Sequence, residues 1–299
     1  ALPVPAINGP TDVCANSMFT YTTESGMTDY TWTIVGGSGS SSGNSIDVTW
    51  DNIPSGTHSV SVTYKLNDCQ AASPTVLNVT VTGTVQNTST GVWYCSIKDA
   101  ISNAGIDNTI VVSAGNYFES DIIIDKDGLT MTGAGKTSTF IKPDPTKVDD
   151  HACSPTGGVV HHGIIIKAQN VTINNLTIDG GATWQYRMGI TSSYWNGGPY
   201  NNTHIENVNV NNVWYRGIVL RMNGALTSGH DVINCHVEGS GSTCGDYQSW
   251  AILGFNANDI EIKDCTVTGF EQGIATGNYL GTPTACDIQG NNVTRSEEH

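Results

Sequence analysis

Aromatic rings and arginines recur at similar positions in the second half of this sequence. They lie before or at the start of four short segments, MGITSS (188–193), RGIVLR (216–221), WAILGF (250–255) and QGIATG (272–277). Seven of these residues, at the first three segments, form the predicted binding set: Trp184, Tyr186, Arg187, Trp214, Tyr215, Tyr247 and Trp250. Rings and guanidinium groups along a groove can stack on sugar rings and hydrogen bond to them. The set therefore predicts a binding site for a polysaccharide or surface glycan, unless the rings only cover a corner between strands.

Two carboxylates are candidates for acid–base chemistry. Asp179 and Glu238 each come one position after the last apolar residue of a repeated segment. If these segments are stacked strands, both side chains point outward and lie two repeats apart, roughly 9–10 Å from the strand spacing. That separation is near the upper end for the carboxyl pair of an inverting glycosidase. Solvated acidic side chains are the alternative interpretation.

Three aspartates lie close together in the middle of the sequence, at Asp144, Asp149 and Asp150. Carboxylate oxygens and loop carbonyls are the ligands that Ca²⁺ takes in proteins. A Ca²⁺ site is one interpretation of this group, and an acidic loop without a bound ion is the other. No other cofactor is predicted.

The elements that position these residues are repeated. Five similar segments lie between Asn170 and Arg295: NVTINNLTI (170–178), NTHIENVNV (202–210), HDVINCHV (230–237), NDIEIKDCTV (258–267) and CDIQGNNV (286–293). A unit this small cannot bury its own apolar face, so neighbouring units must stack. Alternating apolar residues and β-branched side chains predict strands rather than helices. The sequence therefore predicts a β-solenoid.

Aligning the segments predicts the register of the stack. Their last apolar residues are Ile178, Val210, Val237, Val267 and Val293. Two positions earlier, on the same side of each strand, come Leu176, Val208, Cys235, Cys265 and Asn291. One position before these come the turn-forming residues Asn175, Asn207, Asn234, Asp264 and Gly290. Such residues tolerate a left-handed backbone, and their side chains can hydrogen bond along the stack. We therefore expect an inward column beside a column of turns.

Residues 1–82 differ from the repeats. Short alternating segments such as YTWTIV, SIDVTW and HSVSVTYKL are separated by polar turns, which predicts a β-sandwich. A family resemblance rests on Pro5, Ile7, Gly9, Pro10, Val13, Cys14, Tyr30, Trp32, Gly36, Gly37, Val48, Trp50, Asp68 and Cys69. The region resembles the PKD-like immunoglobulin-type domains of secreted and cell-surface proteins of the Bacteroidetes. The resemblance implies a spacer or a weak binding module. Residues 83–91 are expected to form a polar linker.

The region from residue 92 onward resembles a second family. The segment CSIKDAISNA predicts a short amphipathic helix with Ile97, Ala100 and Ile101 on one face. The segments NTIVVSAGNYFES and GLTMTGAG follow it. This order is similar to the start of right-handed parallel β-helices of the pectin-lyase-like superfamily, in which the helix caps the apolar end of the solenoid. The expected fold class is all-β: an immunoglobulin-like β-sandwich over residues 1–82, and a capped right-handed parallel β-helix over residues 92–299.

Polysaccharide lyases with this fold need a basic residue to remove a proton beside a uronate, and positive charge or Ca²⁺ to neutralise its carboxylate. Arg216 and Arg221 lie in the middle repeats and are the candidates for this catalysis. The combination of NTD, DD, GHG and RIK blocks that marks polygalacturonases in this superfamily is absent, and so is the Arg-x-Pro-x-x-Arg segment of lyases. These absences favour a protein without catalytic activity.

The chain contains eight cysteines, at positions 14, 69, 95, 153, 235, 244, 265 and 286. An even number in an acidic, solenoidal chain fits an oxidising, extracellular location. We expect disulfides between Cys14 and Cys69, between Cys95 and Cys153, and between Cys244 and Cys286. The equivalent positions of Cys235 and Cys265 leave two alternatives open, a bridge or a stacked pair of buried thiols.

Charge and composition disfavour some partners. The 299 residues include 12 Lys and Arg against 27 Asp and Glu, for a net charge of −15. Such a charge disfavours binding to nucleic acid or to an anionic membrane. No apolar run approaches the ~20 residues that span a bilayer. The last repeat stops partway through a coil, so we expect a longer natural polypeptide whose C-terminal region contacts secretion or cell-surface machinery.

Two classes of function fit these observations. One is an exported surface protein, an adhesin or stalk, that binds a glycan without changing it. The other is a carbohydrate-active enzyme, either a polysaccharide lyase or an inverting glycoside hydrolase, that acts in a groove along the solenoid.

Overall fold

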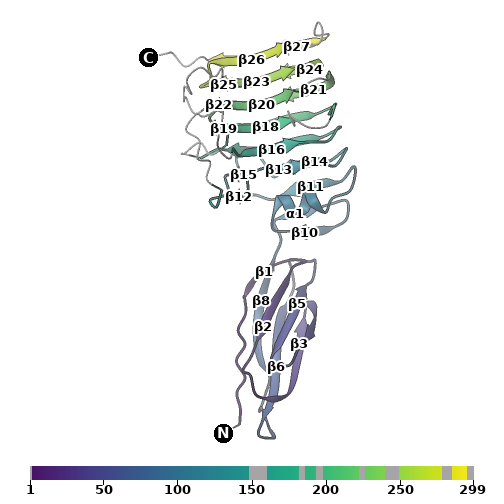
Figure 1. Cartoon of the computed structure of the whole chain (residues 1–299), viewed down its shortest axis with the longest axis vertical. Coiled ribbons are helices and arrows are strands. Elements are labelled where there is room, and N and C mark those ends of the chain that lie inside the picture. The colour runs from purple at the N-terminus through teal and green to yellow at the C-terminus, as the bar shows by residue number, and fades with distance from the viewer. Residues whose placement is uncertain are drawn as a thin grey trace. The chain divides into compact units, whose positions relative to one another are not determined.

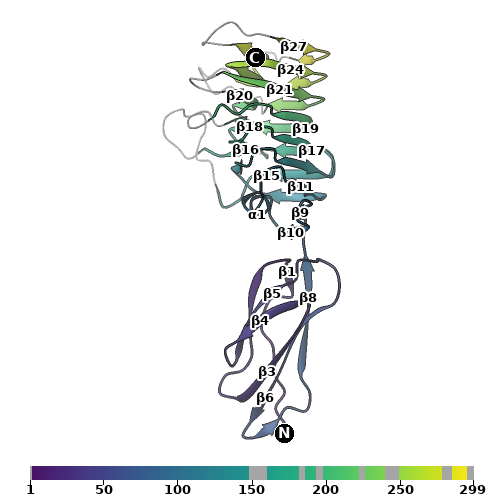
Figure 2. The same ribbon diagram turned by 90° about the vertical axis from the view of Figure 1, so that its right-hand side faces the viewer.

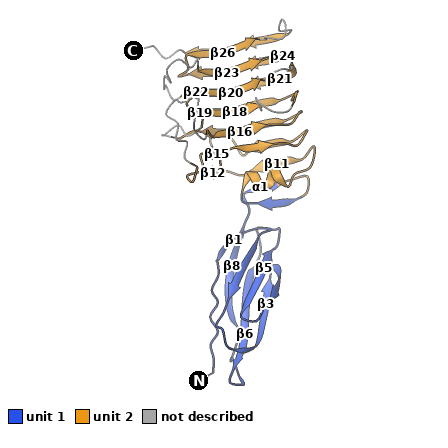
Figure 3. Cartoon of the chain, viewed as in Figure 1, with its two compact units in different colours: residues 1–86, 91–95 blue, residues 87–90, 96–299 orange. Residues whose placement is uncertain are grey.

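The computed structural model divides the chain into two compact units. One consists of residues 1–86 and 91–95, and the other of residues 87–90 and 96–299 (Figure 3). The structure describes residues 2–147, 160–181, 186–192, 198–221, 226–239, 249–277 and 285–294. The segment expected to be a linker contains the short strand β9 (Val85–Asn87).

The first unit is a β-sandwich. Its strands are β1 (Asp12–Cys14), β2 (Met18–Thr22), β3 (Thr28–Val35), β4 (Gly37–Ser41), β5 (Ser45–Trp50), β6 (His58–Leu66), β7 (Cys69–Gln70) and β8 (Thr75–Thr82). One sheet has the order β1-β8-β6-β3 with β7 beside β6, and the other has the order β2-β5-β4. Alternate residues of β6 are buried, as the period-2 pattern predicts. Between the sheets, Trp50 Nε1 donates to the Tyr21 hydroxyl at 3.2 Å.

The disulfide of this unit joins Cys14 to Cys95, so the predicted pair of Cys14 and Cys69 is wrong. The short strand β10 (Val92–Tyr94) follows β9 and brings Cys95 into the first unit. Trp93 packs against the core of the sandwich, and its backbone N–H donates to Asn52 Oδ1 at 2.7 Å. Cys69 is an exposed free thiol.

The two other predicted disulfides depend on cysteines outside the described residues. Because Cys95 is bonded to Cys14, its predicted pairing with Cys153 is wrong. Cys286 is an exposed free thiol, and its predicted bridge to Cys244 falls on a residue outside the described ranges, so it stays a prediction. Cys153 and Cys244 themselves lie outside the described residues.

The second unit begins with the predicted cap helix α1 (Ile97–Ser102). Its buried face consists of Ile97, Ala100 and Ile101, the residues that helical spacing places together. Ser96 is the N-cap, and its hydroxyl accepts from the Asp99 N–H at 3.0 Å. The Glu119 carboxylate accepts from the N–H groups of Ile97 and Lys98 at 2.7 and 3.0 Å. The first turn of the helix is therefore fixed to the first coil of the solenoid.

The rest of this unit is a right-handed parallel β-helix (Figures 1 and 2). One face is a sheet with the order β13-β16-β18-β20-β23-β26. Its strands are β13 (Ile122–Ile124), β16 (His162–Ile166), β18 (Met188–Ser192), β20 (Arg216–Arg221), β23 (Trp250–Phe255) and β26 (Gln272–Gly277). Figure 1 shows these strands stacked as successive rungs.

The opposite face is a second, bent sheet. Its strands are β11 (Thr109–Val112), β12 (Gly115–Phe118), β14 (Thr130–Gly133), β15 (Thr139–Lys142), β17 (Thr172–Asp179), β19 (His204–Val213), β21 (Thr227–Ile233), β22 (His236–Gly239), β24 (Ala257–Lys263), β25 (Thr266–Thr268), β27 (Cys286–Gln289) and β28 (Asn292–Thr294). The predicted register is confirmed, because Ile178 pairs with Val210, Val210 with Val237, Val237 with Val267, and Val267 with Val293.

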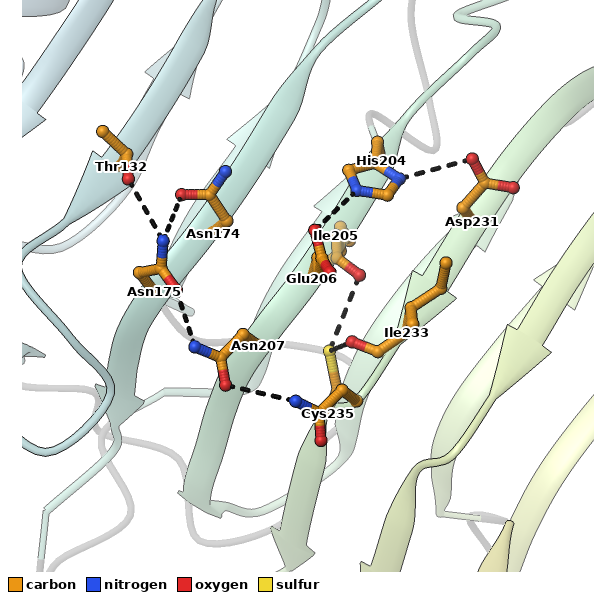
Figure 4. Close-up of polar contacts among 11 residues, drawn as sticks. Thr132, Asn174, Asn175, His204, Ile205, Glu206, Asn207, Asp231, Ile233 and Cys235 are labelled. Carbon is orange, nitrogen blue, oxygen red and sulfur yellow. Dashed lines mark hydrogen bonds and ion pairs between the residues drawn. The ribbon is translucent and has the colours of Figure 1, made fainter. Parts of the chain in front are cut away.

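The bend in this sheet lies at the predicted column of turns. Asn175, Asn207, Asn234 and Asp264 all have left-handed φ angles, between 51° and 57°. The side-chain amides of the three asparagines form a ladder along the stack (Figure 4). Asn175 Nδ2 donates to Thr132 Oγ1 at 3.5 Å, Asn207 Nδ2 to Asn175 Oδ1 at 2.6 Å, and Asn234 Nδ2 to Asn207 Oδ1 at 3.4 Å. The expected role of this column as turn chemistry is confirmed.

Candidate functional site

The candidate site is a stripe of side chains at the edge of the β13-β16-β18-β20-β23-β26 sheet. The first residues of its last five strands are in register: His162, Met188, Arg216, Trp250 and Gln272. The residue after Arg216 is Gly217, whose missing Cβ points at Val237 inside the solenoid. Alternation therefore turns the side chain of Arg216, and of its register partners, outward.

Two of these outward residues, Arg216 and Trp250, form one stack with Arg187, Trp214 and Tyr215, which directly precede strands β18 and β20. We call these five residues the flank stripe. The Arg187 guanidinium lies 5.7 Å from the ring centre of Trp214 and 4.8 Å from that of Tyr215. The Arg216 guanidinium lies 4.2 Å from Tyr215 and 4.7 Å from Trp250. Cations and rings therefore alternate over successive coils, an arrangement in which each ring face stabilises a positive charge.

Burial differs along the flank stripe. Arg216 is 6% and Trp214 is 7% exposed, whereas Arg187, Tyr215 and Trp250 are partly exposed. Arg216 Nη2 also donates to the Tyr215 hydroxyl at 2.6 Å. A guanidinium stays protonated in proteins, and the rings around Arg216 favour its charge. The position of Arg216 therefore suits binding better than proton abstraction.

The second arginine predicted to be catalytic lies elsewhere. Arg221 is the last residue of β20, whereas Arg216 is the first, so the two Cα atoms are about 16 Å apart along the strand. The Arg221 guanidinium packs 4.6 Å from the ring centre of Phe255. Its backbone N–H donates to Ser192 Oγ at 2.8 Å. The two arginines therefore do not converge on one substrate bond.

The other predicted ligand-binding rings divide into two groups. Tyr186 is fully buried, and its hydroxyl donates to the backbone carbonyl of Glu119. Burial raises the pKa of Tyr186, so it acts as a structural ring beneath the surface. Trp184 and Tyr247 lie outside the described residues.

A charged cluster beside the first coils was not predicted from the sequence. Asp121 Oδ2 lies 2.6 Å from His161 Nδ1, and Asp121 Oδ1 accepts from the His162 N–H at 2.8 Å. The Lys147 ammonium lies 3.9 Å from the same carboxylate. Burial lowers the pKa of His162 to about 4, so this ring is neutral at pH 7. A carboxylate that orients a histidine is an arrangement used in proton transfer, although it is also common as a structural pair.

Two more groups beside this cluster have shifted pKa values. Burial raises the pKa of Glu119, whose carboxylate holds the helix N–H groups. Burial and the nearby Lys147 ammonium lower the pKa of Lys98. Perturbed groups of this kind gather at functional sites more often than elsewhere. No sequence motif indicates this cluster, because Asp121 and His161 come from separate coils and are 40 residues apart.

The two candidate carboxylates lie on the opposite sheet. Asp179 pairs with Asn211, and Asn211 with Glu238, which confirms that they are two coils apart. Asp179 Oδ1 accepts from Asn212 Nδ2 at 2.8 Å and from the Gly181 N–H at 3.0 Å. Glu238 lies 3.7 Å from His236 Nε2. Asp179 is therefore part of a turn, and both carboxylates belong to strands of the second, bent sheet, β17 and β22.

Acidic side chains on this face form ion pairs with a nearby histidine and a nearby lysine. His204 lies 3.3 Å from both Glu206 and Asp231 (Figure 4). A cavity of about 460 Å³ is lined by Gly229, Asp231, Asp259, Ile260, Glu261, Ala285, Cys286 and Asp287. Lys263 forms ion pairs with Glu261 and Asp287 beside it. Within the described ranges, no group of three or more His, Cys, Asp or Glu side chains is arranged to hold a metal ion.

The predicted Ca²⁺ site falls mainly outside the described residues, which exclude Asp149 and Asp150. Asp144 Oδ1 accepts from the N–H and the hydroxyl of Thr146 at 2.9 and 2.7 Å. These bonds lower the pKa of Asp144. Asp144 therefore closes a local turn, and the Ca²⁺ site stays a prediction.

Comparison with known proteins identifies the first unit by sequence. A family model described as a PKD-like domain matches residues 1–79. No curated protein matches the sequence of the chain. No helix in the described part of the chain is long and apolar enough to cross a membrane.

The similar solved structures are β-helix proteins. A pectin methylesterase in complex with a hexasaccharide shares 15% identity at a TM-score of 0.46, over 71% of this chain and 65% of that one. A pectin methylesterase from Erwinia chrysanthemi shares 14% at 0.37, over 60% and 53%. The catalytic domain of an α-1,3-glucanase in complex with nigerose shares 13% at 0.40, over 89% and 54%. This chain thus spans between about half and two thirds of each relative, and likeness this distant says nothing about activity.

Proposed function

We propose that this protein binds a glycan along the flank stripe, as an exported, adhesin-like surface protein. The observation that supports this proposal most directly is the alternation of guanidinium groups and rings over successive coils. Such a stack is held rigid by its own contacts, so little conformational freedom is lost when a ligand binds. Its partly exposed members offer ring surface and N–H donors at the spacing of the strands.

Export is part of the same proposal. The disulfide between Cys14 and Cys95 is of a kind that persists in oxidising compartments and is rare in the cytosol. A PKD-like first unit and a rigid solenoid fit a spacer that carries a binding surface.

Binding can be tested with two matched ring variants. W250A removes a partly exposed ring of the flank stripe, and F118A removes a ring that is 58% exposed on another strand of the same unit. We expect W250A to weaken binding at least tenfold for a polysaccharide that retards the wild-type protein in affinity gel electrophoresis, and F118A to change it less than twofold. Equal effects of the two variants, with both folded by circular dichroism, would argue against the flank stripe as the site.

A carbohydrate-active enzyme is the second candidate function. The observation that favours it is the register of Asp179 and Glu238 two coils apart, at roughly the separation of an inverting pair. Arg216 and Arg221 are the corresponding candidates for a lyase. New reducing ends from a polysaccharide panel, lost in D179N and E238Q, would support a hydrolase. Unsaturated ends detected by ultraviolet absorbance, lost in R216K or R221K, would support a lyase.

A further inference from the structure

Two buried cysteines occupy the inward column of neighbouring coils. Cys235 and Cys265 are 2% and 1% exposed. Each directly precedes a paired position, His236 opposite Thr266, so the two cysteines face each other at the start of β22 and β25. Adjacent strands lie about 4.8 Å apart, within the range of about 4.4–6.8 Å between the Cα atoms of bridged cysteines. The spacing of the two strands is therefore compatible with a bridge between these positions.

Both sulfurs are free thiols here, and the bonds that they make are weak. Cys235 Sγ donates to the carbonyls of Ile233 at 3.3 Å and Ile205 at 3.7 Å (Figure 4). Cys265 Sγ donates to the carbonyl of Val232 at 3.4 Å, so it points toward the coil that contains Cys235. A thiol is a poor donor, and losing these contacts costs little when a covalent bond replaces them.

The pair lies where the amide ladder ends. Each rung of the ladder is an asparagine that donates its N–H to the side-chain oxygen of the previous coil, up to Asn234. The next position is Asp264, and an ionised carboxylate has no N–H to donate. The step from Asn234 to Asp264 thus cannot continue the ladder. Cys235 and Cys265 are the residues that directly follow on each coil.

We propose that Cys235 and Cys265 form a disulfide that joins two successive coils of the β-helix when the protein folds in an oxidising compartment. The two thiols lose two protons and two electrons as the S–S bond forms. A small-molecule disulfide accepts them and is reduced to two thiols, or the disulfide of an oxidoreductase accepts them and is reduced to a dithiol. The disulfide between Cys14 and Cys95 fits the same redox setting.

The bridge forms while the coils stack, before the site is closed. Disulfide exchange requires a thiolate. In the folded protein the Cys265 thiol and burial raise the pKa of Cys235, whereas the Cys235 thiol lowers the pKa of Cys265. Both sulfurs are buried, so an oxidant reaches them only before the coils have closed. Once formed, the bond is shielded from reductants by the same burial.

Peptide mapping of the full chain tests this directly. The chain is refolded in a glutathione redox buffer, alkylated, and digested without reduction by a protease that cleaves after glutamate. Glu206, Glu238, Glu261, Glu271 and Glu297 divide the four last cysteines among peptides 207–238, 239–261, 262–271 and 272–297. We expect peptides 207–238 and 262–271 to be linked, and to separate on reduction.

The control is C286A, which removes an exposed thiol and should leave the linked pair unchanged. Recovery of peptides 207–238 and 262–271 unlinked, with Cys235 and Cys265 alkylated only after denaturation, would overturn the proposal. A link from either peptide to 239–261 or 272–297 would overturn it as well.

Discussion

Asn207 meets two separate requirements of the solenoid at one position. Its backbone is left-handed, with φ at 54°, a conformation that asparagine adopts more readily than most residues. Its amide both donates to Asn175 and accepts from Asn234. An asparagine serves this position because glycine lacks the amide and other side chains strain the backbone.

Two variants separate these contributions. N207G keeps the left-handed backbone but loses both side-chain hydrogen bonds, and we expect it to lower the free energy of unfolding by about 1–2 kcal/mol. N207A loses the bonds and also strains the backbone, which costs about 1 kcal/mol more. Urea unfolding should therefore rank wild type above N207G and N207G above N207A. Equal stability of the two variants would mean that the backbone conformation carries no cost.

His230 makes the stability of the solenoid depend on pH. It is 1% exposed, its Nδ1 accepts from the Thr203 N–H at 3.3 Å, and its Nε2 lies 2.9 Å from Thr227 Oγ1. A neutral ring fits both contacts, since a second N–H on Nδ1 would face the Thr203 donor. Burial lowers the pKa of His230 to about 4.

The pKa of His230 in the folded protein lies below the unfolded value of about 6.5. Neutral His230 therefore makes its full contribution to the free energy of unfolding above a pH of about 6.5. It is lost as the pH falls from about 6.5 toward 4, by up to about 3 kcal/mol. We expect H230Q to be less stable than wild type at pH 7 and to lose less on acidification. Urea unfolding at a series of pH values measures this slope, and parallel curves would contradict the prediction. The slope that remains in H230Q includes His162, whose pKa is also lowered to about 4.

For single residues, the sequence predicts the place of a residue in the fold better than it predicts the burial of its side chain. Aligning the repeats places Asn207 at a turn, which is confirmed, and the register of the strands puts Arg216 between Met188 and Trp250. The burial of Arg216 could not be predicted, because it depends on Tyr215 and Trp250 from two coils closing over the guanidinium. Residues that face outward by alternation are not necessarily accessible.

At the scale of elements, a column of small residues lets the two sheets approach each other. Gly163, Gly189, Gly217, Ala251 and Gly273 each take the second position of a strand. A Cβ added at Gly217 would lie 2.1 Å from Val237 Cγ1 and 2.5 Å from the Ala251 carbonyl oxygen. Glycine is needed here for close packing.

We therefore expect G217A to destabilise the β-helix by about 1–3 kcal/mol, as overpacked cores do. The matched control is A251G at the next coil, which removes a methyl group and should cost about 0.5–1 kcal/mol. Because Gly217 follows Arg216, G217A should also weaken glycan binding through the displaced flank stripe. Thermal unfolding with the binding assay measures both effects, and a G217A protein as stable as A251G would contradict the packing argument.

The sequence also predicts elements more reliably than the contacts between distant ones. The helix at Ile97–Ser102 and the paired strands follow from local spacing. The contact of Asp121 with His161 spans 40 residues and includes no repeated motif, so sequence alone could not place them together. The pairing of Cys14 failed for the same reason, because the strand that returns Cys95 to the sandwich is only three residues long.

At the scale of the whole molecule, each compact unit is stabilised by interactions of its own. The β-helix is held by stacked coils, and the sandwich by a core around Tyr21 and Trp50 together with one disulfide. Cys14 and Cys95 both belong to the first unit, although 81 positions separate them. The disulfide therefore lowers the conformational entropy of the unfolded first unit and leaves that of the unfolded solenoid unchanged.

We accordingly expect C14S/C95S to destabilise only the first unit, by about 2–4 kcal/mol, the usual effect of losing a disulfide. Differential scanning calorimetry of the full chain should resolve two transitions, one of which falls by several degrees while the other keeps its midpoint. C69S is the control, since Cys69 is an exposed free thiol and its replacement should move neither transition. G217A should lower only the transition that C14S/C95S leaves in place. A shift of both transitions in C14S/C95S would mean that the two units unfold together, and the disulfide would then stabilise the chain as a whole.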